Sequence, residues 1–138
     1  LDEIDGAGHD CGWCALYSDL VQASDERIGR ILAAIDAREA RFNEQWLVMI
    51  VSDHGHRREG GHGGDTVIER TSFIGVNRPE LMNERFYTPG PPLEITDDPE
   101  SNALMGYPGI TSVVPSILHY FGHPPRESDN FQGQSLIR

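Results

Sequence analysis

An apolar run that breaks abruptly into Asp, His and Gly constrains this chain most. Residues 47–51 are all aliphatic or methionine, which is typical of a strand buried on both faces in a parallel sheet that helices cover. Asp53 and His54 follow just after it, at the carboxyl end of the strand, where open α/β sheets place their ligand sites. We therefore predict an α/β fold with functional residues at this edge of its sheet.

Two further segments carry residues that suit metal binding. Asp5 and His9 are four residues apart with only small residues between them, so a curled loop would bring the two side chains together. His62 lies in a run of glycines, whose backbone can fold tightly and approach an ion closely. Carboxylate oxygen and imidazole nitrogen are suitable ligands for zinc and related metals. The alternative for Asp5 and His9 is a turn aspartate beside a surface histidine.

The apolar spacing predicts the remaining elements. Apolar residues recur three and four positions apart from Leu16 to about Phe42, which indicates an amphipathic helix. Residues 1–5 are interpreted as the end of a strand, so strand, helix and strand would form a right-handed crossover between parallel strands. Beyond the glycines we expect a strand over 70–76, a long surface excursion over 79–109, a helix over 109–122 and an extended segment over 130–138.

Composition limits the domain organisation and the classes of partner. A chain of 138 residues that is 38% hydrophobic can bury one core, so one domain or part of one is expected. The net charge of -11 argues against a nucleic-acid-binding surface, which would need a basic patch. No apolar run approaches the roughly 20 residues that span a bilayer. The chain starts without Met or a signal-peptide pattern, and we interpret it as the C-terminal part of a longer protein.

Two cysteines support an alternative function. Cys11 and Cys14 form Cys-Gly-Trp-Cys directly before the predicted helix, as in a thioredoxin-like redox pair. That fold would need a strongly apolar strand in front, and the preceding Leu-Asp-Glu-Ile-Asp is a poor one. A structural disulfide or two packed thiols is the preferred interpretation.

The order of these motifs resembles the alkaline phosphatase superfamily, and within it the type I phosphodiesterase/nucleotide pyrophosphatase branch. The matching text is D-G-A-G-H, the amphipathic helix, V-S-D-H-G, G-G-H-G-G, E-R-T-S-F-I-G-V, I-T-S-V-V-P-S-I-L-H-Y-F-G and G-Q-S-L. The resemblance implies a parallel-sheet sandwich with helices on both faces, of which residues 1–138 would be the C-terminal part of one catalytic domain. It also implies an extracellular or periplasmic location.

Carried over to this sequence, the resemblance implies two divalent metal ions, with zinc the expected metal and manganese admitted. Asp5, His9 and His62 match the ligands of one ion, and Asp53 and His54 match part of the shell of the other. The family completes that second shell with an upstream Asp and a Ser or Thr nucleophile, and neither has a matching segment in this chain. We therefore expect the isolated chain to be inactive. The histidine, His56, and two arginines that follow His54 are interpreted as solvated loop residues.

The implied chemistry is hydrolysis of a small-molecule phosphate ester. Two cations roughly 4 Å apart bind the entering and leaving oxygens of an in-line displacement and lower the pKa of the attacking hydroxyl or water. Within the superfamily, a cofactor-independent phosphoglycerate mutase-like enzyme has a similar ligand order. A sulfatase has a comparable metal loop but does not explain Asp5 with His9. A metal-binding module without catalysis is a further alternative, since the chain lacks the nucleophile.

Overall fold

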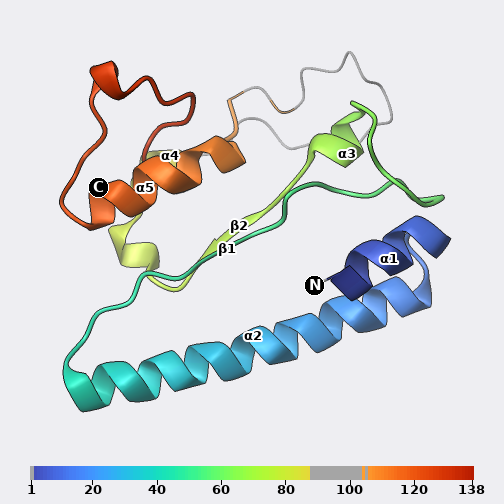
Figure 1. Ribbon diagram of the computed structural model, residues 1–138, viewed down its shortest axis with the longest axis horizontal. Helices are drawn as coiled ribbons and strands as arrows, with labels where there is room; N and C mark the ends of the chain where they lie inside the picture. The colour runs from blue at the N-terminus through green and yellow to red at the C-terminus, as the bar shows by residue number, and fades with distance from the viewer. Residues whose placement is uncertain (1, 88–103, 105) are drawn as a thin grey trace. The chain divides into compact units, whose positions relative to one another are not determined.

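The computed structural model describes residues 2–87, 104 and 106–138, which form two compact units (Figure 1). The first unit consists of residues 1–46 and 55–64, and the second unit of residues 47–54 and 65–138. Each unit is therefore assembled from two separate stretches of the chain. No helix among the described residues has both the length and the apolar character needed to cross a membrane.

Two helices, α1 (Asp2–Cys11) and α2 (Ala15–Phe42), form most of the first unit and lie side by side in Figure 1. The buried residues of these helices are the small Ala7, Gly8 and Ser24. The prediction of a strand over 1–5 is wrong, because Asp2 to Asp5 belong to α1. Three acidic residues in its first turn favour the helix, since negative charge is stabilised at a helix N-terminus.

Helix α2 confirms the helix predicted from Leu16 to about Phe42. Its half-buried apolar side chains recur at helical spacing: Leu20, Ile28, Leu32 and Ile35. The helix ends at Asn43 in the left-handed conformation, with φ of 54°, which asparagine tolerates better than most residues. Glu44 then accepts hydrogen bonds from Arg38 Nε at 2.6 Å and from Trp46 Nε1 at 2.9 Å, which holds the departing chain against the helix end.

A small antiparallel sheet, β1 (Met49–Val51) with β2 (Ile74–Val76), lies in the second unit. Ile50 pairs with Gly75 at its centre. We predicted a strand buried on both faces of a parallel sheet, but in the described part of the chain these strands are half-buried and pair with each other alone. The crossover between parallel strands is absent there, since α1 replaces its first strand. The mixture of helices and a small sheet is compatible with part of an α/β fold.

The strand predicted over 70–76 is shorter than expected. Its first residue belongs to helix α3 (Val67–Arg70), which Thr66 caps by accepting a hydrogen bond from the backbone N–H of Glu69. Thr71 Oγ1 then donates to the carbonyl of Val67 at 2.7 Å, so the helical turn is closed by side chains at both ends. These local hydrogen bonds compete with strand formation.

The core of the second unit contains a residue that we placed in a surface excursion. The 3₁₀ turn η1 (Pro79–Leu81) and helix α4 (Glu84–Tyr87) flank Met82, which is fully buried with Leu136 and Ile137. Met82 also forms an antiparallel bridge with Ile137. The surface prediction is therefore wrong at Met82, and residues 88–103 and 105 of the excursion lie outside the described residues.

The helix predicted over 109–122 is confirmed as the 3₁₀ turn η2 (Ile110–Ser112) followed by α5 (Val113–Tyr120). The buried Ser116 Oγ donates to the Ser112 carbonyl and accepts from Leu136 N–H at 2.8 Å. A 3₁₀ turn, η3 (Glu127–Asp129), lies between α5 and the last segment. A Cβ at Gly133 would lie 2.2 Å from the Thr111 backbone, so only glycine allows this approach. The C-terminal segment is thereby attached to α5 and to Met82.

Candidate metal centre

Asp5 and His9 lie one helical turn apart on α1, on the same face of the helix. His9 Nε2 lies 3.8 Å from Asp5 Oδ2, and both side chains are close to half exposed. We expected a curled loop between them, but the helix brings the two side chains together just as effectively. The four-residue spacing is what matters for their convergence.

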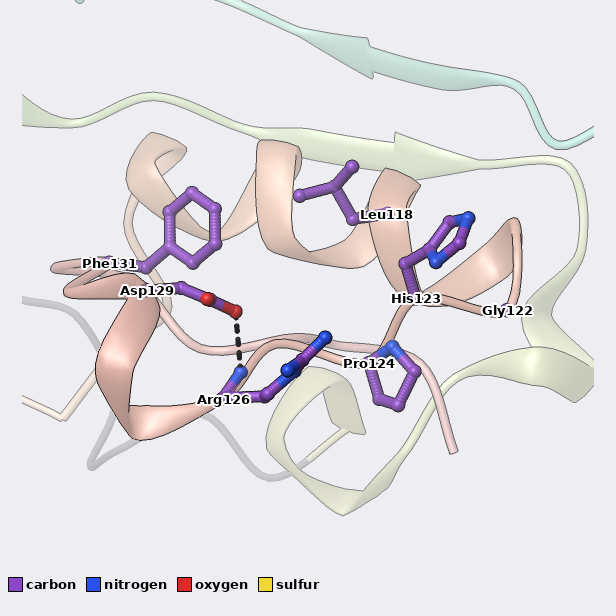
Figure 2. A pocket seen from close by; sticks show the side chains of 7 residues that line it. All are labelled: Leu118, Gly122, His123, Pro124, Arg126, Asp129 and Phe131. Carbon is purple, nitrogen blue, oxygen red and sulfur yellow. Dashed lines mark hydrogen bonds between the residues drawn. The ribbon is translucent and has the colours of Figure 1, made fainter.

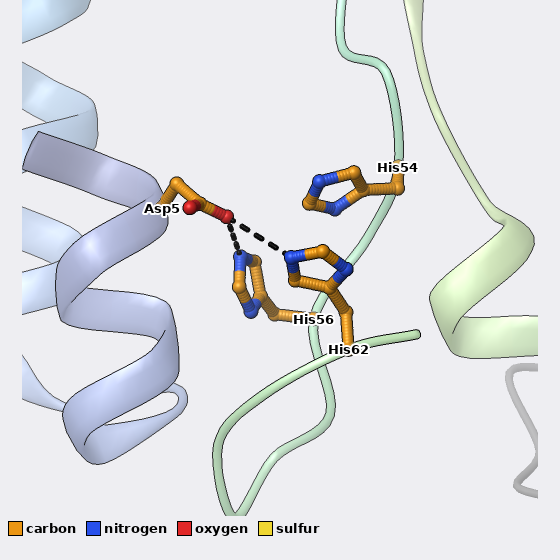
Figure 3. Close-up of side chains that lie close together, drawn as sticks. All are labelled: Asp5, His54, His56 and His62. Atoms are coloured by element: carbon orange, nitrogen blue, oxygen red, sulfur yellow. Dashed lines mark hydrogen bonds and ion pairs between the residues drawn. The ribbon is translucent and has the colours of Figure 1, made fainter. Parts of the chain in front are cut away.

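Two histidines of the segment 55–64 reach the same carboxylate. His56 Nε2 lies 3.1 Å from Asp5 Oδ1, and His62 Nε2 lies 3.3 Å from the same oxygen, as Figure 3 shows. The His62 ring also lies beside the ring of His9, with centroids 4.6 Å apart. His54, which is also drawn in Figure 3, belongs to the second unit.

Backbone contacts hold this loop on the end of α1. Gly61 N–H donates to the carbonyl of Gly8 at 3.0 Å, and Trp13 N–H donates to the carbonyl of Arg58 at 3.1 Å. The Trp13 indole Nε1 donates to the carbonyl of His56 at 3.0 Å, and the Arg58 guanidinium lies over the indole ring. The residues between α1 and α2 therefore fix where the loop histidines lie.

Two glycines make this approach possible. A Cβ at Gly8 would lie 2.7 Å from the imidazole ring of His56, so a side chain there would displace that ring. Gly12 has φ of +60°, and a Cβ on it would lie 2.0 Å from the carbonyl oxygen of Arg58. Neither position admits another residue without movement of the loop.

A disulfide joins Cys11 and Cys14, with their Cα atoms 5.7 Å apart. Cys14 is also the N-cap residue of α2, so the bond closes the turn between the two helices. The structure thus pairs the two cysteines and favours the structural interpretation over two separate thiols. The turn that the disulfide closes contains Trp13, which contacts the loop.

The electrostatics of Asp5 favour its ionised form. Desolvation raises the pKa of the Asp5 carboxyl. The hydrogen bond from His56 and the nearby charges of His9 and His62 together lower it by more, so the pKa lies below its usual value. A carboxylate that keeps its charge beside imidazole nitrogens is available as a metal ligand. Asp5, His56 and His62 each offer one donor atom, and these atoms lie within 4.8 Å of one another. One oxygen and two nitrogen donors fit Zn²⁺ or Mn²⁺.

The other two predicted ligands lie in the second unit, directly after β1. Asp53 is largely exposed, and His54 Nε2 lies 3.5 Å from its Oδ2. Asp53 also lines a pocket of about 400 Å³ together with polar residues that include Arg70, Thr71 and Ser72. Thr71 and Ser72 fall within the strand predicted over 70–76, but they lie between α3 and β2. The assignment of Asp53 and His54 as ligands stays a prediction.

The sequence interpretation missed His56. We treated it as a solvated loop residue, but only 5% of its surface is exposed. Gly8 lies inside α1, and a glycine in a helix commonly has a packing reason, but we predicted a loop there and so did not use this signal. The sequence does not reveal that the packed group is an imidazole more than forty residues away.

A larger hollow of about 730 Å³ lies beside the end of α5, also in the second unit (Figure 2). Its walls include Leu118, His123 and Phe131, and its Asp129 carboxylate accepts the backbone N–H of Arg126. It contains none of the predicted metal ligands. The cluster around Asp5 is therefore the better candidate for a metal site.

Comparison with known proteins identifies the family. The family model of type I phosphodiesterase/nucleotide pyrophosphatase matches residues 1–104, a range that includes Asp5, His9, Asp53, His54 and His62. Searches of curated proteins and of solved structures find no match. The match confirms the resemblance drawn from the motifs, and it is consistent with the alkaline phosphatase superfamily, whose members of this type depend on metal and hydrolyse phosphate esters. The chain belongs to the type I phosphodiesterase/nucleotide pyrophosphatase family.

Proposed function

We propose that this protein is a metal-dependent hydrolase of phosphate esters of the phosphodiesterase/nucleotide pyrophosphatase type. One observation carries the proposal: Asp5 lies 3.3 Å from His62 and 3.8 Å from His9, measured between donor atoms. These are the three residues that match one metal shell of the family. The match of the family model to residues 1–104 supports the same chemistry.

In the proposed mechanism, Asp5, His9 and His62 hold one divalent ion, and Asp53 and His54 contribute to a second. When bound, the ions oppose negative charge on the phosphoryl group and lower the pKa of the attacking hydroxyl or water. The chain's own residues hold and orient the ions. Asp5 is a carboxylate at neutral pH, and its neighbouring histidines lower the pKa of the carboxyl rather than raise it, so it need not lose a proton before binding.

The pocket beside Asp53 is the proposed entry for part of the substrate. The Arg70 guanidinium carries the positive charge that suits a phosphate, and the hydroxyl groups of Thr71 and Ser72 can donate hydrogen bonds to its oxygens. The attacking Ser or Thr and one more Asp would come from a part of the protein upstream of this sequence. Residues 1–138 would then be part of one catalytic domain, with β1 in a larger parallel sheet covered by helices.

The other members of the superfamily are less well supported. A sulfatase does not require the pair Asp5 and His9, and these two residues converge on α1. Zinc is the metal we propose, with manganese as the second choice, since the ligands combine carboxylate and imidazole. A disulfide between Cys11 and Cys14 suits an oxidising compartment, which supports an extracellular or periplasmic location.

The test uses the full-length protein with added zinc and a panel of an aryl phosphodiester, an aryl phosphomonoester and an aryl sulfate. We expect the highest kcat/KM for one of the two phosphates. Asp53→Asn and His62→Ala should each lower the metal content measured by elemental analysis, whereas His123→Ala, a histidine outside the predicted ligands, should leave it unchanged. A higher kcat/KM for the sulfate, or unchanged metal content in both ligand variants, would contradict the proposal.

A further inference from the structure

His56 is a buried polar group of the first unit to which the family resemblance assigns no role. Its ring nitrogen meets the carboxylate oxygen of Asp5 that His62 also approaches (Figure 3). We propose that His56 is a further protein ligand of the metal ion that Asp5 and His62 bind. This inference rests on the proposed metal dependence and adds a residue to that centre.

The distances match the edges of a metal coordination shell. Zinc binds carboxylate oxygen and imidazole nitrogen at about 2.0 to 2.1 Å, so two donors at tetrahedral positions lie about 3.3 Å apart. The separations from Asp5 Oδ1 are 3.1 Å to His56 Nε2 and 3.3 Å to His62 Nε2. His9 Nε2 lies farther away, 3.8 Å from the other carboxylate oxygen. The separation of His56 from Asp5 is therefore close to that of two tetrahedral ligands, whereas the separation given by His9, to Oδ2, is longer.

Packing holds the His56 ring in this orientation. Its face lies against Gly8, where a Cβ would come within 2.7 Å of three ring atoms. The rings of His62 and Tyr17 meet it edge to face, with centroids 4.9 and 6.0 Å away. The Trp13 indole fixes its carbonyl. A ligand held by its surroundings loses little conformational entropy when an ion binds, which favours affinity.

His56 and His9 differ in exposure, which suggests different roles at the ion. The side chain of His56 is 5% exposed, whereas that of His9 is 47% exposed. A catalytic zinc ion keeps one position open for water or substrate beside three protein ligands. Asp5, His56 and His62 would then hold the ion most firmly, and the exposed His9 would be the ligand that water or substrate can displace.

The first experiment observes the ring nitrogens directly. Long-range ¹H–¹⁵N spectra of the full-length protein with ¹⁵N-labelled histidine are recorded as zinc is added to one equivalent. We expect the Nε2 signals of His56 and His62 to move together, because metal coordination changes the shift of the bound nitrogen. If the His62 signal moves while the His56 signal stays in place, His56 only orients Asp5 and the inference is overturned.

The second experiment compares variants by competition with a chromogenic zinc chelator. His56→Ala should lower zinc affinity by at least about 10 to 100-fold, since even residues that merely support a ligand have effects of that size. His9→Ala should have a smaller effect. His119→Ala, which removes an imidazole bonded to Ser135 in the second unit, should have none. Wild-type affinity in His56→Ala would overturn the inference, and His56→Gln serves if the alanine variant does not fold.

The outcome separates this inference from the proposed function. If the wild-type protein binds zinc and hydrolyses a phosphate ester while His56 stays uncoordinated, the proposed function stands and only the role of His56 fails. If the wild-type protein binds no zinc, both fail.

Discussion

The two units bury different kinds of residue. Among the described residues, the buried side chains of the first unit are those of Ala7, Ser24 and His56, which are small or polar. The second unit also buries the polar Glu69, Ser112 and Ser116, but it adds large apolar side chains: Val67, Ile68, Met82, Leu136 and Ile137. Apolar burial is the main source of folding free energy. The second unit therefore has a core of its own, whereas the first unit relies on hydrogen bonds, one disulfide and the fit of the His56 ring.

The candidate metal centre lies in the unit that lacks a large apolar core. The first unit contains the cluster around Asp5, and the polar groups there meet one another with little apolar packing around them. A site whose geometry depends on polar contacts is sensitive to small changes in backbone distance. Substitutions in the core of the second unit should change stability alone, whereas substitutions at the packed positions of the first unit should change both stability and the site.

The largest expected effect is on the core of the second unit. Leu136→Ala should lower the free energy of unfolding by about 2 to 5 kcal/mol, because Leu136 is fully buried and its removal leaves a cavity. Urea denaturation followed by circular dichroism measures it. Phe121→Ala, at a side chain that is 70% exposed, should stay within about 0.5 kcal/mol of the wild type. Equal effects at the two positions would contradict the assignment of the core.

A pair of glycines in α1 tests the first unit. Gly8→Ala should destabilise the protein by about 1 to 3 kcal/mol, because the new methyl group must displace the His56 ring. Gly6→Ala meets nothing within 4 Å and should stabilise the helix by up to about 1 kcal/mol. Thermal unfolding gives both values. If both variants behave alike, the His56 ring does not lie against Gly8.

The smallest expected effect concerns the end of α2. Hydrogen bonds from Arg38 and Trp46 lower the pKa of the Glu44 carboxyl below its usual value of 4.5. A lowered folded-state pKa means that the stabilisation is present above pH 4.5 and is lost as the pH falls through the folded-state pKa. Glu44→Gln should therefore be slightly less stable than the wild type at pH 7, and the difference should shrink as the pH falls below the folded-state pKa. Urea melts at pH 7 and at successively lower pH check this, and a difference that grows toward low pH would contradict it.

Local pattern explains what could be predicted of the fold. Helix α2 and helix α5 follow from apolar residues three and four positions apart, which the chain repeats long enough to be unambiguous. Met82 could not be found this way, because its burial depends on Leu136 and Ile137, far along the chain. The parallel sheet was inferred from the apolar run over 47–51. The described residues give β1 one antiparallel neighbour instead.

The candidate site divides in the same way. Residue spacing predicted that Asp5 and His9 converge, and it did so despite the wrong local conformation. The glycine run pointed to His62. The position of the His56 ring depends on a glycine in another segment and on the Trp13 contact. Its burial is therefore a tertiary property that no local sequence pattern contains.

The length of α2 limits how the chain can return to Asp5. The helix has 28 residues and therefore spans roughly 42 Å. His56 contacts Trp13 next to the start of this helix, so residues 43–55 must travel back over almost its whole length. At about 3.3 Å per residue a fully extended chain covers roughly that distance and little more. A connection of this length has few residues to spare, so the length of α2 limits which residues of the loop can lie opposite Asp5.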